Sequence, residues 1–325
     1  MTDSISVVIP TTGARRESLA ASIRSALEQS HPPCEVLVVL DSASAAGDAL
    51  PFEDHPVVRV IRSDRSSGPA GSRNAGILAA RGRWIAFLDD DDLWYAEKTQ
   101  AQISRIGVTK RNVLVVARAT HVDETGSSQV FPTKRMRPGE QLMEYVLRSP
   151  TAFSIAGFIL DTVLIDSETA KQELFDETLL RLEDFEWLIR IHAKRLVDIF
   201  IVWEPLAVVR AAPRARTPGR QSTAGNVDIL RSWALETVRP VSRRYYYNFL
   251  LSSVLRQELQ NGRRREAARV LLEAIWPKSS LATYISAVVL LVQPWSARSN
   301  WFVRCAKKAV RVARRRIDVG HRGLS

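Results

Sequence analysis

Four consecutive aspartates, Asp89 to Asp92, directly follow the apolar run 84–88 and form the most distinctive group of ionisable residues in the sequence. Carboxylates so close together repel one another, and the end of a buried strand is partly shielded from water. A divalent cation held by oxygen ligands is the simplest source of compensating charge. Residues two apart on an extended segment point the same way, so Asp89 and Asp91 are predicted to share one ion. The alternative is a solvated acidic turn in which Asp92 caps a helix that begins at Leu93.

Two other acidic positions suit a binding or catalytic role. Asp41 ends a second apolar run, where a carboxylate can accept hydrogen bonds from a nucleobase or a ribose hydroxyl; the alternative is an Asx turn before Ser42. Glu183 and Asp184 open a predicted helix over residues 185–194. One of them can act as a general base toward an attacking hydroxyl, although acidic residues at a helix start also serve simply as partners of the helix dipole.

A glycine-spaced stretch, residues 68–76, runs into a predicted helix over residues 71–80. Its backbone amides, together with Arg73, can bind phosphate. The spacing matches neither a Walker A loop nor a GxGxxG fingerprint. The alternative is therefore a loop followed by a helix that packs closely on its neighbours.

The first 120 residues alternate between strand and helix patterns, which is the arrangement needed to bring these side chains together. Strands are predicted over 6–10, 34–40, 57–61 and 84–88, and helices over 17–29 and 71–80. Near-continuous apolar strands separated by amphipathic helices are typical of a mostly parallel sheet covered on both faces. Ligands bind beyond the carboxyl ends of such strands. One edge of the sheet is therefore expected to carry Pro10, Thr11, Asp41 and Asp89.

The rest of the chain is less regular up to about residue 226 and helical beyond it. A strand over 113–117 and helices near 141–147 and from Asp184 are predicted, followed by an arginine-rich loop over 211–226. Leu281–Val292 is the nearest approach to a membrane span, but it is short of the ~20 apolar residues that a bilayer requires. We expect it to be a buried or interfacial helix.

Composition excludes several classes of protein. The chain has 325 residues, 46% hydrophobic and 25% charged, which excludes intrinsic disorder as its main state. Two cysteines, Cys34 and Cys305, are too few for a disulfide framework or a zinc site and fit a reducing compartment such as the cytosol. No secretory signal is evident at the start, and we expect a cytoplasmic location.

The net charge of +11 is concentrated near the end of the chain: residues 226–325 hold 19 Lys and Arg against 6 Asp and Glu. Residues 302–317 fit an amphipathic helix with one basic face, preceded by Trp295 and Trp301. Segment 299–325 is therefore predicted to bind an anionic membrane surface, here the inner face of the cytoplasmic membrane. The alternative is a helix that contacts a protein partner; a nucleic-acid partner is not expected, because no nucleic-acid-binding module accompanies the charge.

Five sequence blocks in one order carry a resemblance to a known family. The chain resembles an inverting family-2 glycosyltransferase with the GT-A fold, through VVIPT (7–11), EVLVVLDSAS (35–44), GPAGSRNAG (68–76), WIAFLDDDDLW (84–94) and LFDET with EDFEWLIR (174–190). The resemblance implies a GT-A domain over 1–225, a Rossmann-like α/β sheet flanked by helices, followed by a helical extension over 226–325. It also implies transfer of a sugar from a nucleotide-diphosphate donor, with a UDP-sugar favoured, to a glycan or lipid-linked hydroxyl in cell-surface polysaccharide or glycolipid assembly.

The resemblance also implies roles for individual residues. Asp89 and Asp91 match the ends of the family's DxD motif and would bind Mg²⁺ or Mn²⁺. Asp184 matches the usual catalytic base, with Glu183 beside it as a second catalytic candidate. Donor binding is implied for Pro10, Thr11, Asp41, Arg73 and Asp90.

Two departures from the family pattern leave details open. Ser42 and Ala43 stand where the family often has a second polar residue and glycine, and Arg210 is followed by Ala-Ala-Pro where the family has a histidine. The arginine-rich loop 211–226 is a candidate to close over the diphosphate instead. A nucleotidyltransferase and a non-catalytic sugar-nucleotide binder remain as alternatives. The missing glycine-rich loop with lysine near the first strand argues against the former, and the full acidic set argues against the latter.

Overall fold

The computed structural model describes residues 3–41, 49–62, 68–106, 112–123, 125–147, 159–179, 182–210, 224–275 and 278–292. The chain forms two compact units. The first comprises residues 1–135 and 157–218, and the second comprises residues 136–156 and 219–325. The predicted segments 42–44 and 299–325 and most of the arginine-rich loop lie outside the described residues.

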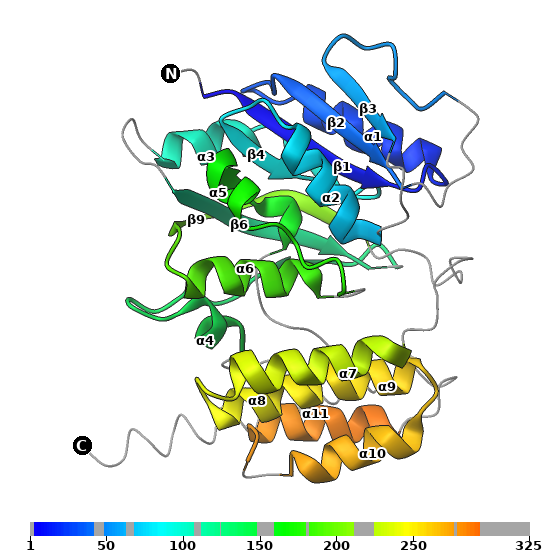
Figure 1. Ribbon diagram of the computed structural model, residues 1–325, viewed down its shortest axis with the longest axis vertical. Helices are drawn as coiled ribbons and strands as arrows, with labels where there is room; N and C mark the ends of the chain where they lie inside the picture. Colours follow the sequence, from blue (N-terminus) through cyan, green and yellow to red (C-terminus); the bar gives the residue numbers. More distant parts are fainter. Residues whose placement is uncertain are drawn as a thin grey trace. The chain divides into compact units, whose positions relative to one another are not determined.

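The first unit is built on one mixed sheet whose four N-terminal strands are parallel (Figure 1). Strand order is β3-β2-β1-β4-β8-β6-β9-β5, with β7 beside β6. The short strand β8 runs antiparallel to both β4 and β6, and so joins the parallel half to the rest of the sheet. The strands span Ile5–Thr11 (β1), Glu35–Leu40 (β2), Val58–Arg62 (β3), Trp84–Phe87 (β4), Leu93–Trp94 (β5), Val113–Val122 (β6), Ser128–Phe131 (β7), Leu164–Asp166 (β8) and Asp198–Arg210 (β9).

Helices cover both faces of the parallel strands, because alternate side chains of β1 point to opposite sides. Val7 and Ile9 belong to the same apolar cluster as Leu19 and Ile23 of one helix, α1. On the other face, helix α2 lies along β1 (Figure 1). The helices of this unit span Arg16–Leu27 (α1), Gly68–Ala79 (α2), Lys98–Ile106 (α3), Ser167–Gln172 (α5) and Glu183–Ala193 (α6).

The glycine-spaced stretch is part of helix α2 itself, which begins at Gly68 and not at residue 71. Gly68 has a φ of 65°, a conformation that side chains rarely adopt. A Cβ built on Gly76 would lie 2.4 Å from Cγ1 of Val8, so glycine is needed there for the helix to approach the sheet. The structure thus accounts for Gly76 by packing, the alternative that the sequence left open.

The second unit is a set of packed helices with its own apolar core. Its fully buried side chains include Phe249, Leu250, Leu251 and Val254. The helices span Leu142–Leu147 (α4), Ala224–Trp233 (α7), Arg243–Phe249 (α8), Leu255–Gln260 (α9), Arg264–Glu273 (α10) and Leu281–Val292 (α11), with π-helical turns at Ala234–Val238 and Leu250–Val254. Among the described residues, none of these helices combines the length and apolar character that crossing a bilayer requires.

Residues 136–156 belong with the C-terminal helices in this division, although they precede residue 157 of the sheet unit in the chain. Helix α4 contacts α8, and the Asn248 side chain donates a hydrogen bond to the Leu147 carbonyl at 3.2 Å. The predicted catalytic domain of residues 1–225 is a functional division and stays a prediction.

Candidate active site

The carboxyl ends of β1, β2 and β4 meet at one edge of the sheet, as the apolar strands indicate. The amide of Asp41 donates to the Thr11 carbonyl at 2.9 Å, and the amide of Leu88 donates to the Val8 carbonyl at 3.1 Å. Parallel pairing therefore places the residues that follow these strands next to one another. Thr11 and Asp41 are buried and Pro10 is half-buried. The structure brings Pro10, Thr11, Asp41 and Asp89 to this common edge.

Asp90 and Asp91 are held by the last residue of β1 and by the segment that follows it. The Thr11 hydroxyl donates to Oδ2 of Asp90 at 2.6 Å and accepts from the Gly13 amide at 2.9 Å. The Arg15 guanidinium bridges Asp90 and Asp91: its Nη2 contacts Asp90 and its Nη1 contacts Asp91. Arg15 was not among the residues expected from the sequence.

Arg73 links the aspartate run to helix α6. Its guanidinium donates to Oδ1 of Asp89 and to Oε1 of Glu183, both at 2.8 Å, and lies 5.8 Å from the centre of the Phe175 ring. The residue is only 4% exposed. Burial opposes its charge, yet Asp89, Glu183 and Asp184 together raise the pKa of Arg73. Arg73 is therefore a fixed positive charge between two groups of carboxylates.

The two acidic residues at the start of α6 have different surroundings. Glu183 is buried and engaged by Arg73, whereas Asp184 accepts the Phe185 amide at 2.8 Å through one oxygen. Burial, assisted by the charge of Glu183, raises the pKa of Asp184 to about 6 against the opposing effect of Arg73. A carboxylate with a pKa near neutrality suits proton transfer, so Asp184 is a candidate base.

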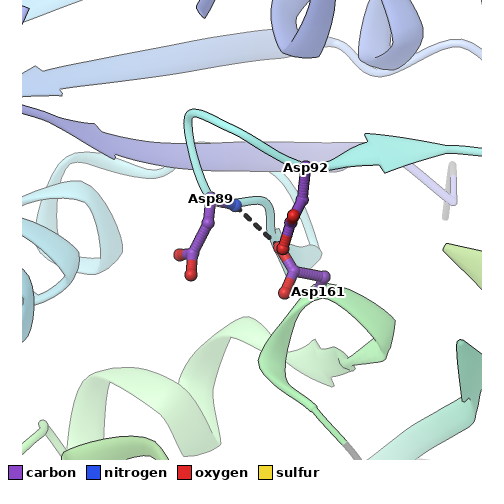
Figure 2. A group of neighbouring side chains, drawn as sticks. All are labelled: Asp89, Asp92 and Asp161. Carbon is purple, nitrogen blue, oxygen red and sulfur yellow. Dashed lines mark hydrogen bonds between the residues drawn. The ribbon is translucent and has the colours of Figure 1, made fainter. Parts of the chain in front are cut away.

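Asp161 joins the edge from a part of the chain in which we predicted no site residue. It lies in a 3₁₀ turn, Leu160–Thr162, just before β8, and the antiparallel pairing of β8 with β4 returns the chain to Asp89. The Asp89 amide donates to Oδ1 of Asp161 at 2.7 Å. Figure 2 shows the carboxylates of Asp92 and Asp161 facing each other, while that of Asp89 points away from them.

Asp89, Asp92 and Asp161 are the group of metal-type ligands found among the described residues, with one oxygen of each within 4.8 Å of the others. The predicted pair was Asp89 with Asp91, and Asp91 is instead engaged by Arg15 in the structure. Asp92 does not cap a helix, because Leu93–Trp94 forms strand β5 and Oδ1 of Asp92 accepts the Arg210 amide at 2.9 Å.

The positive side chains near this edge compensate only part of the negative charge of its carboxylates. Burial and the charge of Asp161 raise the pKa of Asp92 to about 10, and burial and Asp89 raise the pKa of Asp161 to about 7. Burial also raises the pKa values of Asp90 and Asp91, although Arg15 opposes both shifts. A divalent cation with hard oxygen ligands would offset this excess, so the donor set fits Mg²⁺ or Mn²⁺.

Lys98 is a further basic residue near the carboxylates of Asp89, Asp92 and Asp161. It is fully buried, donates to the Gln102 side chain at 2.8 Å and lies 4.0 Å from the Trp94 ring centre. Burial lowers the pKa of Lys98 to about 7, against the opposing effect of Asp161. Like Asp161, Lys98 was absent from the expected site, because neither residue stands in a recognisable motif.

Comparison with known proteins gives a consistent family likeness. Residues 6–160 match the model of "Glycosyl transferase family 2". The chain is 29% identical over 258 residues to the amylovoran biosynthesis glycosyltransferase AmsB of Erwinia amylovora, covering 76% of this chain and 81% of that protein. It is 37% identical over 102 residues to an Escherichia coli protein, UDP-Glc:alpha-D-GlcNAc-diphosphoundecaprenol beta-1,3-glucosyltransferase WfgD, covering 31% and 40% of the two chains.

The fold has counterparts among solved structures. Staphylococcus aureus TarS, residues 1–349 in complex with UDP-GlcNAc, superposes with a TM-score of 0.58 at 17% identity and covers 88% of this chain and 81% of that one. The same fragment in complex with UDP gives a TM-score of 0.57 at 18% identity. At this identity the likeness concerns the fold, which is that of the GT-A glycosyltransferases.

Proposed function

The chain belongs to glycosyl transferase family 2, and from this premise we propose that it transfers one sugar from a nucleotide-diphosphate donor to a hydroxyl acceptor with inversion at the anomeric carbon. One observation carries the proposal. Asp89, Arg73, Glu183 and Asp184 form a continuous chain of charged side chains between the end of β4 and the start of α6. This chain couples a candidate metal ligand to a candidate base across one site.

The donor is proposed to be a UDP-sugar held by the predicted residues Pro10, Thr11, Asp41, Arg73 and Asp90. Buried carboxylates at the end of parallel strands suit ribose hydroxyls or nucleobase N–H groups, and Thr11 and Asp90 are already joined by a hydrogen bond. The solved TarS structures contain UDP and UDP-GlcNAc, and the relative WfgD is named for UDP-Glc, which supports this choice of nucleotide.

A divalent cation, Mg²⁺ or Mn²⁺, is proposed to bind Asp89 and Asp91, with Asp92 and Asp161 adjoining. When bound, such an ion stabilises the negative charge that develops on the leaving diphosphate. Other residues of the chain hold the proposed ligand Asp89 and the neighbouring Glu183 in position. Arg73 fixes Asp89 and Glu183 in place, and the amide of Asp89 is fixed by Asp161.

Asp184 is proposed to take the proton from the acceptor hydroxyl as the new bond forms. A single in-line displacement needs this base on the side of the sugar opposite the diphosphate, and the product then has inverted configuration. Glu183 supports the role indirectly. Arg73 holds Glu183 in place, and the charge of Glu183 contributes to the raised pKa of Asp184.

The acceptor is proposed to be a hydroxyl of a glycan or of a lipid-linked sugar in cell-surface polysaccharide or glycolipid assembly. AmsB is named for amylovoran biosynthesis and WfgD for a diphosphoundecaprenol-linked acceptor, which supports this class. We place the enzyme at the inner face of the cytoplasmic membrane, bound through the basic segment 299–325. The basic, amphipathic sequence pattern of that segment supports a lipid surface, and the lack of a recognisable nucleic-acid-binding module in the sequence argues against nucleic acid.

A panel of nucleotide sugars with Mg²⁺ or Mn²⁺ tests the proposal. At least one UDP-sugar is expected to raise the melting temperature only when metal is present, and to release UDP on turnover with a lipid-linked sugar acceptor. NMR of the product is expected to show an inverted anomeric centre. If no nucleotide sugar stabilises the protein with either metal, the proposal fails; release of pyrophosphate from a nucleoside triphosphate would favour the nucleotidyltransferase instead.

A further inference from the structure

Two arginines balance the aspartate run, and they differ in how firmly they are held. Arg73 is buried, contacts two carboxylates and packs near Phe175. The Arg15 side chain is 49% exposed, and it reaches Asp90 and Asp91 from the loop between β1 and α1. The pair of Arg15 with Asp91, whose side chain is 24% exposed, is partly open to water and therefore weak, whereas a buried pair is costly to break. Arg15 is therefore the arginine that another cation can displace.

The backbone of Arg15 is fixed although its side chain is exposed. The Arg15 carbonyl accepts the Leu19 amide at 2.9 Å, which is the first turn of α1. The guanidinium can therefore change partners by side-chain rotation alone, without rearrangement of the helix.

Arg15 contacts the same carboxylate, Asp91, that is proposed to bind the divalent cation. One Asp91 oxygen cannot satisfy both at full strength, since the two cations repel each other at contact distance. Asp90, by contrast, is also held by Thr11 and remains anchored if Arg15 leaves. Arg15 and the divalent cation therefore compete for Asp91 alone.

We propose that Arg15 is an exchangeable counter-charge of the donor site: it yields Asp91 to the divalent cation and then pairs with the diphosphate of the donor. The inference rests on the proposed function and adds a residue to it. A guanidinium presents a planar fork of donors that matches phosphate oxygens, so the nitrogens that leave Asp91 are suited to the anion that arrives with the metal.

The proposal makes two predictions of opposite sign for Arg15→Ala. Mn²⁺ alone, titrated by electron paramagnetic resonance, is expected to bind roughly tenfold more tightly, because a competing cation is removed. UDP in saturating Mn²⁺, titrated by calorimetry, is expected to bind roughly tenfold more weakly, because a charged phosphate contact is lost. The loss is expected to be smaller for UMP, which has one phosphate fewer.

Arg16→Ala is the matched control. Arg16 is adjacent, exposed and equally charged, but its guanidinium donates to the Ala49 carbonyl and not to the aspartates. Its removal is expected to leave both affinities within about twofold of wild type, since an exposed charge that contacts none of the site carboxylates is screened by salt. Arg15→Lys retains the charge without the bridging fork, so its Mn²⁺ affinity is expected to lie between those of wild type and Arg15→Ala.

The outcomes separate this inference from the proposed function. Unchanged Mn²⁺ affinity in Arg15→Ala, or equal shifts in Arg15→Ala and Arg16→Ala, would overturn the role of Arg15 while the wild type still binds Mn²⁺ and UDP. Tighter UDP binding by Arg15→Ala would overturn it as well. A wild-type protein that binds neither Mn²⁺ nor UDP would overturn the proposed function, and this inference with it.

Discussion

Replacement of Asp184 by asparagine is expected to lower kcat for sugar transfer by about 10²- to 10⁴-fold, the usual contribution of a general base. Asparagine keeps the size of the side chain and an oxygen that can accept the Phe185 amide, so the start of α6 should persist. Affinity for UDP and Mn²⁺ should remain close to that of the wild type, because the base acts on the acceptor. Steady-state kinetics with a UDP-sugar and calorimetry with UDP measure the two effects separately.

The pH dependence gives an independent check of this assignment. Because the pKa of Asp184 is raised to about 6, kcat should increase with pH through about 6 and level off above it, as the carboxylate becomes able to accept a proton. That acidic limb should be absent from the residual activity of Asp184→Asn. Asp176→Asn is a suitable control, since it removes an exposed carboxylate that accepts hydrogen bonds from the amide and hydroxyl of Thr178. Full activity of Asp184→Asn would contradict the assignment.

Replacement of Arg73 by methionine is expected to destabilise the protein by about 3–5 kcal/mol, the cost of removing one partner from a buried ion pair. Methionine fills much of the volume, but it leaves Asp89 and Glu183 without their shared cation. Activity should be lost as well, because both carboxylates are then free to move. Urea unfolding monitored by circular dichroism measures the change in stability.

Arg62→Met is the matched control for Arg73. Arg62 pairs with Glu53 at the surface, with half of its side chain exposed, so its loss should cost no more than about 1 kcal/mol. Equal costs for the two variants would contradict the view that Arg73 organises a buried site.

The cost of Arg73→Met should grow with pH. Asp161 and Asp184 already have raised pKa values in the folded protein, and removing Arg73 removes an effect that lowers both. A carboxyl group whose folded pKa exceeds its unfolded value binds more protons when folded, so its contribution to stability falls as pH rises toward that folded pKa. The difference between variant and wild type should therefore be larger at pH 8 than at pH 5. A pH-independent difference would mean that these carboxylates are not coupled to Arg73.

The parallel half of the sheet could be predicted from the sequence because its strands are short, continuous apolar runs. Their common direction alone places Thr11, Asp41 and Asp89 at one edge. The position of Asp161 could not be predicted in this way, because it depends on the pairing of β8, an antiparallel strand of three residues within an irregular region. Nor could the role of Arg15 be predicted, because its contact with Asp90 and Asp91 is made by a long side chain and leaves no spacing signal.

Other differences have equally specific causes. The glycine-spaced stretch allows two physical explanations, and only the fold shows that Gly76 serves the close approach of α2 to Val8. The alternative interpretation, a helix capped by Asp92, is wrong because Leu93 and Trp94 form a strand that pairs with the distant Val208 and Ala207 of β9. Tertiary pairing of this kind overrides a local capping pattern.

We expect side chains from separate strands to hold a cation and a nucleotide diphosphate together at one edge of the sheet. Anomalous diffraction from crystals of the full chain grown with Mn²⁺ and UDP tests this expectation most directly. We predict one strong manganese peak within bonding distance of Asp89 and Asp91, bridged to the diphosphate, with Asp184 facing the same space. Manganese or UDP bound away from this edge, under conditions in which the enzyme is active, would contradict the account.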